Sequence, residues 1–518
     1  MNPSQIHISH PSLPILPSLD AAAVASTTGT TLPVHSPFDG KQIAEVPLSS
    51  PDDVDQAFKV ARKAQKTWGQ VPLRERRKVA DRFGKLVLEN RVWLLNLLQL
   101  ETGKARSAAF EEVIDLPLWA NFVYRNAGTA LRPRRKRGAL PGLTQTTEHR
   151  VPHGAVGIIT PWNYPLTLPG TDTLPALVAG NSVVLKPDSI TPLTGIAIAD
   201  LLLQAGVPEG VLQVVVGPGS VVGEALTSNA DYVTFTGSTK TGRAMAEKLG
   251  GRLVGFAAEL GGKNPLLVLG DADVQRAATG AVQASFANAG QLCIGIERIY
   301  VTKPHWETFT ERLVAETKAL TLGPGYDWST AVGSLAGKAQ LDKVSAAVED
   351  AKSKGATVLA GGNARPDLGP FFFEPTVLTD VTENMDVYAG ETFGPVVSLY
   401  KVRDDEAAIR AANNSDYGLN ASIWSRRSGK AVATRIQTGT VNVNDGYGAA
   451  WASYGAPMGG MKQSGIGRRH GLIGIQKYTE PQTVAVQHLL PVSGPAWLSH
   501  ETWAKTLTVA ASVMRHLP

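Results

Sequence analysis

The feature that most constrains the fold is an alternation of short β-branched runs with helical segments, which begins near residue 154. One helical segment, Leu193–Ala205, is ended by Gly206 and Pro208. Strands and helices that alternate in this way form a parallel sheet covered by helices on both faces. The strands expected in this block include Ala155–Ile159, Val183–Leu185, Gln213–Val216 and Tyr232–Phe235.

A second alternating block begins near residue 263 and predicts another α/β domain of comparable size. Helices are expected across 273–288 and from about 305 to 318. Upstream of both blocks, residues 52–128 repeat their apolar positions at helical spacing. The fold class predicted is therefore α/β with two parallel-sheet domains. The strands of the second block are Leu266–Leu269, Ile296–Val301, Val396–Tyr400, Ser422–Trp424 and Thr440–Asn444.

Three segments lie outside these blocks. Residues 1–35 are rich in Ser, Thr, Pro and Ala and are interpreted as a loosely packed N-terminal arm. Residues 131–151 and 478–487 are strand-like but belong to neither sheet. Strands left over from complete sheets are candidates for pairing between subunits, so we expect a homodimer or homotetramer.

The last segment, 488–518, is expected to hold a tail helix that begins near Ser499. A helix on a membrane surface would normally carry more basic residues than Lys505 and Arg515 supply. We therefore expect the helix to pack on the protein's own body, with membrane association as the alternative. The apolar residues on one side of it are Trp503, Leu507, Ala510, Ala511 and Met514.

Composition removes several classes of protein. The 518 residues are 43% hydrophobic and 18% charged, which excludes disorder, and the single cysteine excludes a disulfide scaffold. A net charge of +5 over this length gives weak support for nucleic-acid or membrane partners, and none is expected. The basic run Arg132–Arg137 is interpreted as a solvated turn between strands. The first basic residue is Lys41 and no apolar run reaches about 18–20 residues, so we expect a cytoplasmic protein.

Three motifs could carry chemistry. Cys293 ends the polar stretch Asn-Ala-Gly-Gln-Leu-Cys, which favours a functional loop over a buried structural thiol. Glu259 precedes paired glycines, either as an exposed turn residue or as a general base. Asn163, in Pro-Trp-Asn-Tyr-Pro, offers an amide that could stabilise an oxyanion. No metal site is expected.

Together these motifs resemble the aldehyde dehydrogenase superfamily. The resemblance runs from about residue 35 to 487 and includes Phe-Thr-Gly-Ser-Thr-Lys-Thr-Gly at 235–242, Glu-Thr-Phe-Gly-Pro at 391–395 and Pro-Met-Gly-Gly-Met-Lys-Gln-Ser-Gly at 457–465. Within the superfamily, the chain looks most like the actinobacterial NADP-type succinate-semialdehyde dehydrogenase branch. The motifs that carry this resemblance are Lys-Pro-Asp-Ser at 186–189, Phe-Ala-Asn-Ala-Gly-Gln-Leu-Cys at 286–293 and Gly-Arg-Arg-His-Gly at 467–471. The resemblance implies a Rossmann-like cofactor domain at 36–130 and 152–258, a catalytic domain at 259–477, and oligomerisation strands at 131–151 and 478–487.

The resemblance also assigns roles. Cys293 would attack the aldehyde carbon, and the Asn163 side chain and the Cys293 backbone amide would hold the oxyanion. The thiohemiacetal would become a thioester, which water activated by Glu259 would hydrolyse to a carboxylic acid. The residues implied for binding the nicotinamide cofactor are Trp162, Asn163, Lys186, Pro187, Asp188, Ser189, Gly237, Ser238, Leu260, Glu391 and Phe393.

The expected cofactor is NADP, with NAD possible. NAD-preferring members of the family carry a Glu where this chain has Ser189, and a carboxylate there would repel a 2′-phosphate. Lys186 would then be free to pair with that phosphate. Asp188 complicates this interpretation, because it is acidic and lies one position away.

The substrate is expected to be succinate semialdehyde, although Ala287 and Thr171 stand where better-known branches carry carboxylate-binding arginines. One alternative is a dehydrogenase of apolar or aromatic aldehydes. Another is a catalytically silent relative that serves as a structural or binding protein. Aromatic residues that could flank the substrate tunnel are Trp119, Trp162, Trp451 and Tyr454.

Overall fold

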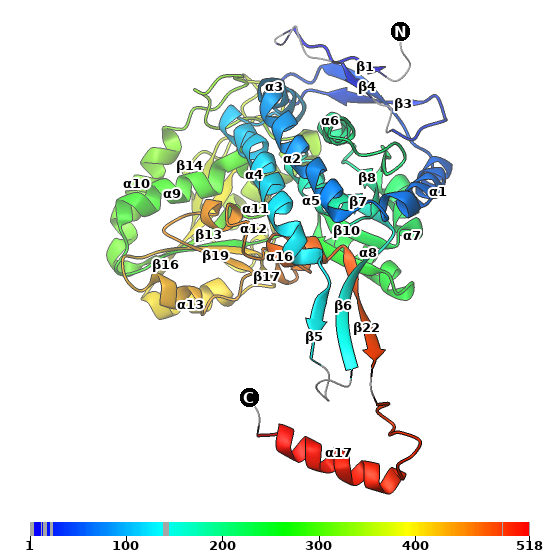
Figure 1. Ribbon diagram of the computed structural model, residues 1–518. Helices are drawn as coiled ribbons and strands as arrows, with labels where there is room; N and C mark the ends of the chain where they lie inside the picture. The colour runs from blue at the N-terminus through cyan, green and yellow to red at the C-terminus, as the bar shows by residue number, and fades with distance from the viewer. Residues whose placement is uncertain are drawn as a thin grey trace.

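The computed structural model describes residues 5–11, 13, 18–20, 24–137, 144–488 and 490–516. Parts of the expected arm and of the segments 131–151 and 488–518 therefore lie outside the described residues. Two large sheets, each covered by helices, form the body of the molecule, and a smaller three-stranded sheet projects from it (Figure 1). This architecture confirms the predicted α/β class.

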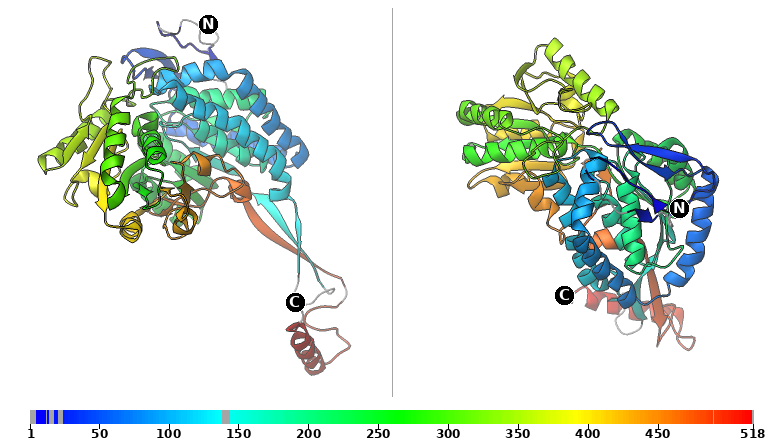
Figure 2. Two further views of the ribbon diagram at one scale, coloured as in Figure 1. Left: turned by 90° about the vertical axis from the view of Figure 1, so that its left-hand side faces the viewer. Right: turned by 90° about the horizontal axis from the view of Figure 1, so that it is seen from above.

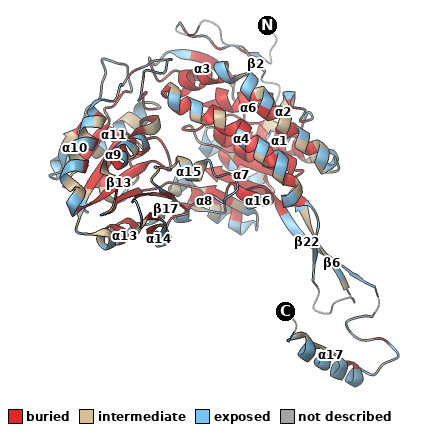
Figure 3. Cartoon of the chain, turned by 60° about the vertical axis from the view of Figure 1, so that its left-hand side comes forward, coloured by how far each residue is buried: buried red, intermediate tan, exposed pale blue. Residues whose placement is uncertain are grey.

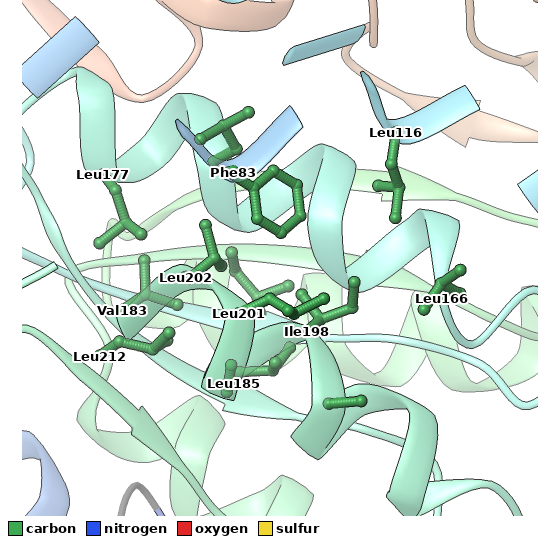
Figure 4. Close-up of a cluster of buried hydrophobic side chains, with 14 of the residues drawn as sticks. Phe83, Leu116, Leu166, Leu177, Val183, Leu185, Ile198, Leu201, Leu202 and Leu212 are labelled. Atoms are coloured by element: carbon green, nitrogen blue, oxygen red, sulfur yellow. The ribbon is translucent and has the colours of Figure 1, made fainter. Parts of the chain in front are cut away.

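The first sheet has six strands in the order β21-β11-β10-β7-β8-β9, parallel except for β21 at one edge. Alternate residues of its strands face two different helical layers: Val183 and Leu185 pack with helices between residues 73 and 204, whereas Val184 packs with the helix Pro51–Trp68. Figure 4 shows the first of these layers. The strands are β7 (Ala155–Ile159), β8 (Ser182–Lys186), β9 (Leu212–Val214), β10 (Tyr232–Thr236), β11 (Gly255–Glu259) and β21 (Gly465–Ile466).

Helices cover this sheet on both faces. The predicted helical region 52–128 forms four helices, the first of which begins with a capping box between Ser50 and Asp53. The predicted helix 193–205 is α6. The helices are α1 (Pro51–Trp68), α2 (Leu73–Glu89), α3 (Arg91–Thr102), α4 (Arg106–Leu131), α5 (Thr167–Val178), α6 (Pro192–Gln204), α7 (Glu224–Asn229) and α8 (Thr239–Gly251).

The second sheet has seven strands in the order β14-β15-β16-β13-β12-β18-β19, parallel except for β14. Its two faces are packed by α9 to α11 and by α13 and α14. The strands are β12 (Asn264–Val268), β13 (Ile296–Thr302), β14 (Thr357–Ala360), β15 (Thr376–Thr379), β16 (Val396–Val402), β18 (Asn420–Trp424) and β19 (Thr440–Val443). The helices are α9 (Val274–Phe286), α10 (Trp306–Lys318), α11 (Lys338–Ser353), α12 (Asp386–Ala389), α13 (Asp405–Asn413), α14 (Gly429–Ala433) and α15 (Gly448–Trp451). A later helix, α16 (Gly471–Gln476), packs on α4 and α5 of the first domain.

The third sheet consists of β5 (Arg134–Lys136), β6 (Thr144–Pro152) and β22 (Thr479–Gln487), all antiparallel. It extends away from the body, as the left view of Figure 2 shows. The interpretation of Arg132–Arg137 as a turn is wrong, because Arg134–Lys136 pairs with Thr146–Glu148 as a strand. Lys136 forms an ion pair with Glu148 of β6 at 2.8 Å, which offsets one of the basic charges of this strand.

The loosely packed arm is also a wrong prediction for the described residues. β3 (Thr31–His35) pairs with β4 (Gln42–Pro47), and β1 (Gln5–Ile6) pairs with β2 (Leu19–Asp20). Ile6, Leu19 and Val34 are buried in the same core cluster as the helices of the first domain. Isolated apolar residues among Ser, Thr and Pro thus anchor the arm.

The tail forms helix α17 (His500–Met514), which begins after the N-cap residue Ser499 as expected. Its expected packing on the body is not found. The helix lies beyond the tips of β6 and β22, and most of its surface is exposed (Figure 3). Trp503, its one buried residue, donates to the Val492 carbonyl within the tail itself. None of the described helices is long and apolar enough to cross a membrane.

Candidate active site

The three residues singled out as catalytic candidates meet between the two large sheets. Asn163 follows β7, and Glu259 ends β11, the strand two positions away in the first sheet. Cys293 precedes β13 of the second sheet. The carboxyl ends of parallel strands share one edge of a sheet, which brings Asn163 and Glu259 together. All three residues line the same two cavities.

A strained loop carries the cysteine. Asn288, Ala289 and Gly290 have φ values of 51°, 53° and 69°, a left-handed run that is costly for the first two. A side chain at Gly290 would meet the Gly394 carbonyl. The Asn264 amide donates to the Cys293 carbonyl at 2.8 Å. The backbone at the cysteine is thus held from several sides.

Asn163 is tied to that loop. Its side-chain nitrogen donates to the Gln291 carbonyl at 2.9 Å, and the Asn288 amide donates to the Asn163 carbonyl at 3.2 Å. The amide of Asn163 therefore lies within the turn that leads to Cys293. A donor at this place can stabilise negative charge on a carbonyl oxygen attacked by the cysteine.

Two buried charged residues that the sequence interpretation missed support Asn163. Lys104 donates to the Asn163 carbonyl at 2.9 Å and forms a buried ion pair with Glu112. The other carboxylate oxygen of Glu112 accepts from the Leu166 and Thr167 amides at 2.9 and 3.0 Å. The pair thereby holds the turn after β7. Glu112 lies within α4 and Lys104 in the turn between α3 and α4, and neither stands in one of the motifs analysed above.

Burial dominates the electrostatics of the catalytic candidates. It raises the pKa of Glu259 to about 7, against the opposing effects of Arg469 and Lys477. Burial, followed by the charges of Glu391 and Glu259, raises the pKa of the Cys293 thiol to about 12. A carboxyl group with a pKa near 7 is suited to act as a general base at neutral pH.

The first cavity, here called the apolar cavity, is lined by Cys293 and by mostly apolar side chains. Of the aromatic residues expected to flank a tunnel, only Trp451 lines it. Trp119 and Tyr454 instead pack against His470, and Trp162 lies in the second cavity. The carboxylate of Glu111 accepts a hydrogen bond from Tyr447 at 2.9 Å, and both residues line the apolar cavity. Its apolar wall consists of Tyr164, Leu168, Leu292, Ile294, Leu419, Trp451 and Met458.

The positions expected to bind a substrate carboxylate hold neither arginine. Ala287 packs beside the apolar cavity, and Thr171 is buried within α5. The only Lys, Arg or His among the residues that line the apolar cavity is Arg469. Its guanidinium forms an ion pair with Asp172 at 2.8 Å.

The second cavity, here called the polar cavity, contains seven of the residues implied for cofactor binding. Ser238 caps the N-terminus of α8 by accepting from the Thr241 amide, so the free amides of that helix point toward this cavity. Glu391 accepts from the Gly262 amide at 2.8 Å. Burial raises the pKa of Glu391 to about 7. The seven residues are Trp162, Asn163, Gly237, Ser238, Leu260, Glu391 and Phe393.

The remaining four candidates, Lys186 to Ser189, follow β8 and are not among the residues that line the polar cavity. Lys186 is buried and donates to the Pro187 carbonyl at 3.2 Å. Ser189 donates to the Gly217 carbonyl at 2.7 Å. Asp188 accepts from the Ile190 amide at 2.9 Å, so its carboxylate is turned along the chain.

Comparison with known proteins gives a consistent result. A protein of Mycolicibacterium smegmatis named "Putative succinate-semialdehyde dehydrogenase [NADP(+)]" is 50% identical over 488 residues, which are 94% of each chain. The crystal structure of an NADP-dependent enzyme of E. coli is 33% identical, with a TM-score of 0.86 over 89% of this chain and 96% of that one. The crystal structure of the aldehyde dehydrogenase KauB of Pseudomonas aeruginosa is also 33% identical, with a TM-score of 0.86 over 89% of this chain and 94% of that one.

The model of the aldehyde dehydrogenase family matches residues 23–484. That match covers most of the chain, including both large sheets and the three residues between them. The chain belongs to the aldehyde dehydrogenase family.

Proposed function

We propose that this chain oxidises succinate semialdehyde to succinate with NADP, through a covalent intermediate on Cys293. The observation that carries the proposal is the position of Cys293, Glu259 and Asn163 on a wall shared by two cavities. One cavity can receive the aldehyde and the other the nicotinamide. The names of the mycobacterial relatives support the choice of substrate and cofactor.

In the first step, the Cys293 sulfur attacks the aldehyde carbon as a thiolate. Because its pKa lies far above neutrality, the free thiol is protonated, and its proton is released to solvent as the thiolate forms. The new C–S bond turns the aldehyde oxygen into an alkoxide. The Asn163 amide and the Cys293 backbone N–H stabilise that alkoxide.

The polar cavity fits a dinucleotide. The N-terminus of α8 offers unpaired backbone amides for a pyrophosphate. Glycine is required at position 261, because a Cβ there would lie 2.5 Å from the Glu391 carboxylate and displace it. Glu391 would hold the nicotinamide ribose, with Phe393 beside the ring and the Leu260 backbone at the carboxamide. When bound, the nicotinamide would accept the hydride that the alkoxide carbon loses as the thioester forms on Cys293.

The remaining step is hydrolysis of the thioester. Glu259 removes a proton from water, the water oxygen adds to the thioester carbon, and the C–S bond breaks to release the acid and the Cys293 thiolate. The raised pKa of Glu259 lets it accept that proton near pH 7. A base at this position favours water over coenzyme A as the acceptor.

Preference for NADP is supported by Lys186 and Ser189 after β8. No carboxylate stands at Ser189 to repel a 2′-phosphate, and the Asp188 carboxylate is engaged by the Ile190 amide. Lys186 would pair with the phosphate. The test is kcat/KM with NADP and with NAD, and a higher value with NAD would contradict this part of the proposal.

A second candidate, oxidation of apolar or aromatic aldehydes, is favoured by the apolar lining described above. Comparing kcat/KM for succinate semialdehyde, hexanal and benzaldehyde decides between the two. A preference for either apolar aldehyde would overturn succinate semialdehyde as the substrate.

The alternative of a catalytically silent relative is tested by alkylating the sole thiol. NADP-dependent oxidation that survives complete modification of Cys293 would contradict the assignment of Cys293 as the nucleophile.

Homodimers or homotetramers are proposed from the projecting sheet. β5 and β22 are its two edges, and nearly all of β22 is exposed in the single chain. Edge strands of this kind invite pairing with another copy. Sedimentation that shows a stable monomer at micromolar concentration would refute it.

A further inference from the structure

Arg469 is a buried cation beside the catalytic residues. It lines the apolar cavity together with Cys293 and Glu259, although its side chain is only 6% exposed. Its backbone is fixed by two hydrogen bonds with Met458, from the Arg469 amide at 2.6 Å and from the Met458 amide at 2.8 Å. A guanidinium held so rigidly within a protein normally has every donor satisfied.

This guanidinium is not fully satisfied. One terminal nitrogen, Nη2, pairs with Asp172 at 2.8 Å and donates to the Thr236 hydroxyl. The other, Nη1, is buried and has no hydrogen-bond partner among the described residues. The positive charge at Nη1 is therefore not offset by any hydrogen bond within the described part of the chain.

Few charged groups influence Cys293 and Glu259. Glu259 is influenced by the cations Arg469 and Lys477 and by the anion Asp172, which accepts a hydrogen bond from Lys477 at 3.3 Å. Cys293 is influenced by two anions, Glu391 and Glu259, and by one cation, Arg469.

Two further titratable groups pack against Arg469. The Tyr478 hydroxyl donates to Asp172 at 3.2 Å. Burial, aided by Arg469 and Lys477, lowers the pKa of His470 to about 3, so His470 is neutral. Neither group can replace the positive charge of Arg469.

The proposed reaction places negative charge on Cys293 while carboxylates remain nearby. Like charges in a buried site disfavour one another strongly. We propose that Arg469, held by Asp172, is a positioning residue whose positive charge stabilises the anionic forms of Cys293 and Glu259. This inference rests on the proposed function, because it assigns Arg469 a part in the same reaction.

The single cysteine makes a direct test possible. The rate of alkylation of Cys293 by iodoacetamide is measured against pH, without aldehyde or cofactor, for the wild type, Arg469→Gln and Arg469→Lys. Loss of the cation should move the alkylation profile of Arg469→Gln to higher pH by about one unit, so that its rate near pH 8 falls about tenfold. Arg469→Lys should restore most of the rate.

Two further variants separate charge from structure. Arg76 is another buried arginine, which donates to the Val178 and Val71 carbonyls, so Arg76→Gln should lower stability without moving the alkylation profile. Asp172→Asn removes an anion but keeps Arg469, so its profile should move to lower pH. This variant also keeps the test decisive if Arg469→Gln does not fold.

The outcomes are distinct. An unchanged alkylation profile in Arg469→Gln, or shifts in the same direction for Arg469→Gln and Asp172→Asn, would overturn the inference. An increase in KM for succinate semialdehyde alone, with hexanal and the alkylation profile unaffected, would instead make Arg469 a contact of the substrate tail and would also overturn it. Failure of the wild type to oxidise any aldehyde would refute the proposed function while the alkylation shift remained measurable.

Discussion

The apolar and polar cavities share three catalytic candidates but are built differently. The apolar cavity has a volume of about 40 Å³ and is closed by side chains such as Trp451 and Leu168. The polar cavity has about 200 Å³ and is lined to a larger extent by the ends of strands and the start of a helix. The polar cavity is lined in part by Gly237 and Gly261, whereas none of the described glycines lines the apolar cavity. Substitutions can therefore change the aldehyde accepted without changing the nicotinamide side.

The largest effect is expected where the cavities meet. Cys293→Ala removes the nucleophile and should lower kcat by at least about 10⁴-fold. Binding of NADPH should remain within about twofold, because the polar cavity keeps its other residues. Stopped-flow absorbance and a fluorescence titration measure the two quantities. A matched loss of NADPH affinity would show that the cavities are not separable.

Glu259→Gln tests whether Glu259, which lines both cavities, is the base for thioester hydrolysis. The steady-state rate should fall about 10²- to 10⁴-fold, while a burst of NADPH no larger than the enzyme concentration persists. Since the pKa of Glu259 is about 7, wild-type thioester hydrolysis should rise with pH through that value as the carboxyl loses its proton. The variant should lack this rise. A variant that shows no burst would place Glu259 before hydride transfer.

Ser189→Glu acts on the nicotinamide side alone. A carboxylate near the 2′-phosphate should lower kcat/KM for NADP by roughly 10- to 100-fold and leave NAD nearly unchanged. Ser189→Ala is the control, because it removes the bond to Gly217 without adding charge. The KM for the aldehyde should stay constant in both variants. Equal losses with NADP and NAD would point to a folding defect.

Trp451→Ala acts on the other side. Removing an indole from the wall of the apolar cavity should raise kcat/KM for benzaldehyde relative to succinate semialdehyde by several-fold. The KM for NADP serves as the internal control. A change in that KM would mean that the two cavities are coupled through the shared wall.

The smallest effect is expected far from both cavities. Truncation after Gln487 removes α17, whose one buried residue packs within the tail. The melting temperature of the body should move by less than about 2 °C, and both KM values should be unchanged. Thermal unfolding measures this. A large decrease would show that the tail is covered by another copy of the chain.

Local patterns predicted much of the architecture. The strand Ala155–Ile159 lies at its expected residues, and the helix expected at 193–205 spans 192–204, because β-branched runs and helix-ending glycines act over short distances. The N-terminal arm could not be predicted in the same way. Its buried residues Ile6 and Leu19 are isolated in a polar segment and pack through long-range pairing.

The candidate site likewise contains some residues that the sequence could predict and others that it could not. Motifs marked Cys293, Glu259 and Asn163, and the structure brings these together. Lys104 and Glu112 stand in no such motif, and Gly-Arg-Arg-His-Gly at 467–471 gave no indication that Arg469 pairs with Asp172. Charged residues that pair across a fold cannot be recognised from the sequence one at a time, because each is of a type that usually lies at the surface.

The left-handed turn before Cys293 bears on how the chain matures during synthesis. Its contacts join the 288–291 loop to Asn163, so the turn is complete only when both large domains have formed. A nascent chain that ends at Glu259 has neither Cys293 nor β21, the strand that pairs with β11 at Glu259. The first sheet, and with it the arrangement of all three catalytic candidates, is complete only when β21 has been synthesised and paired.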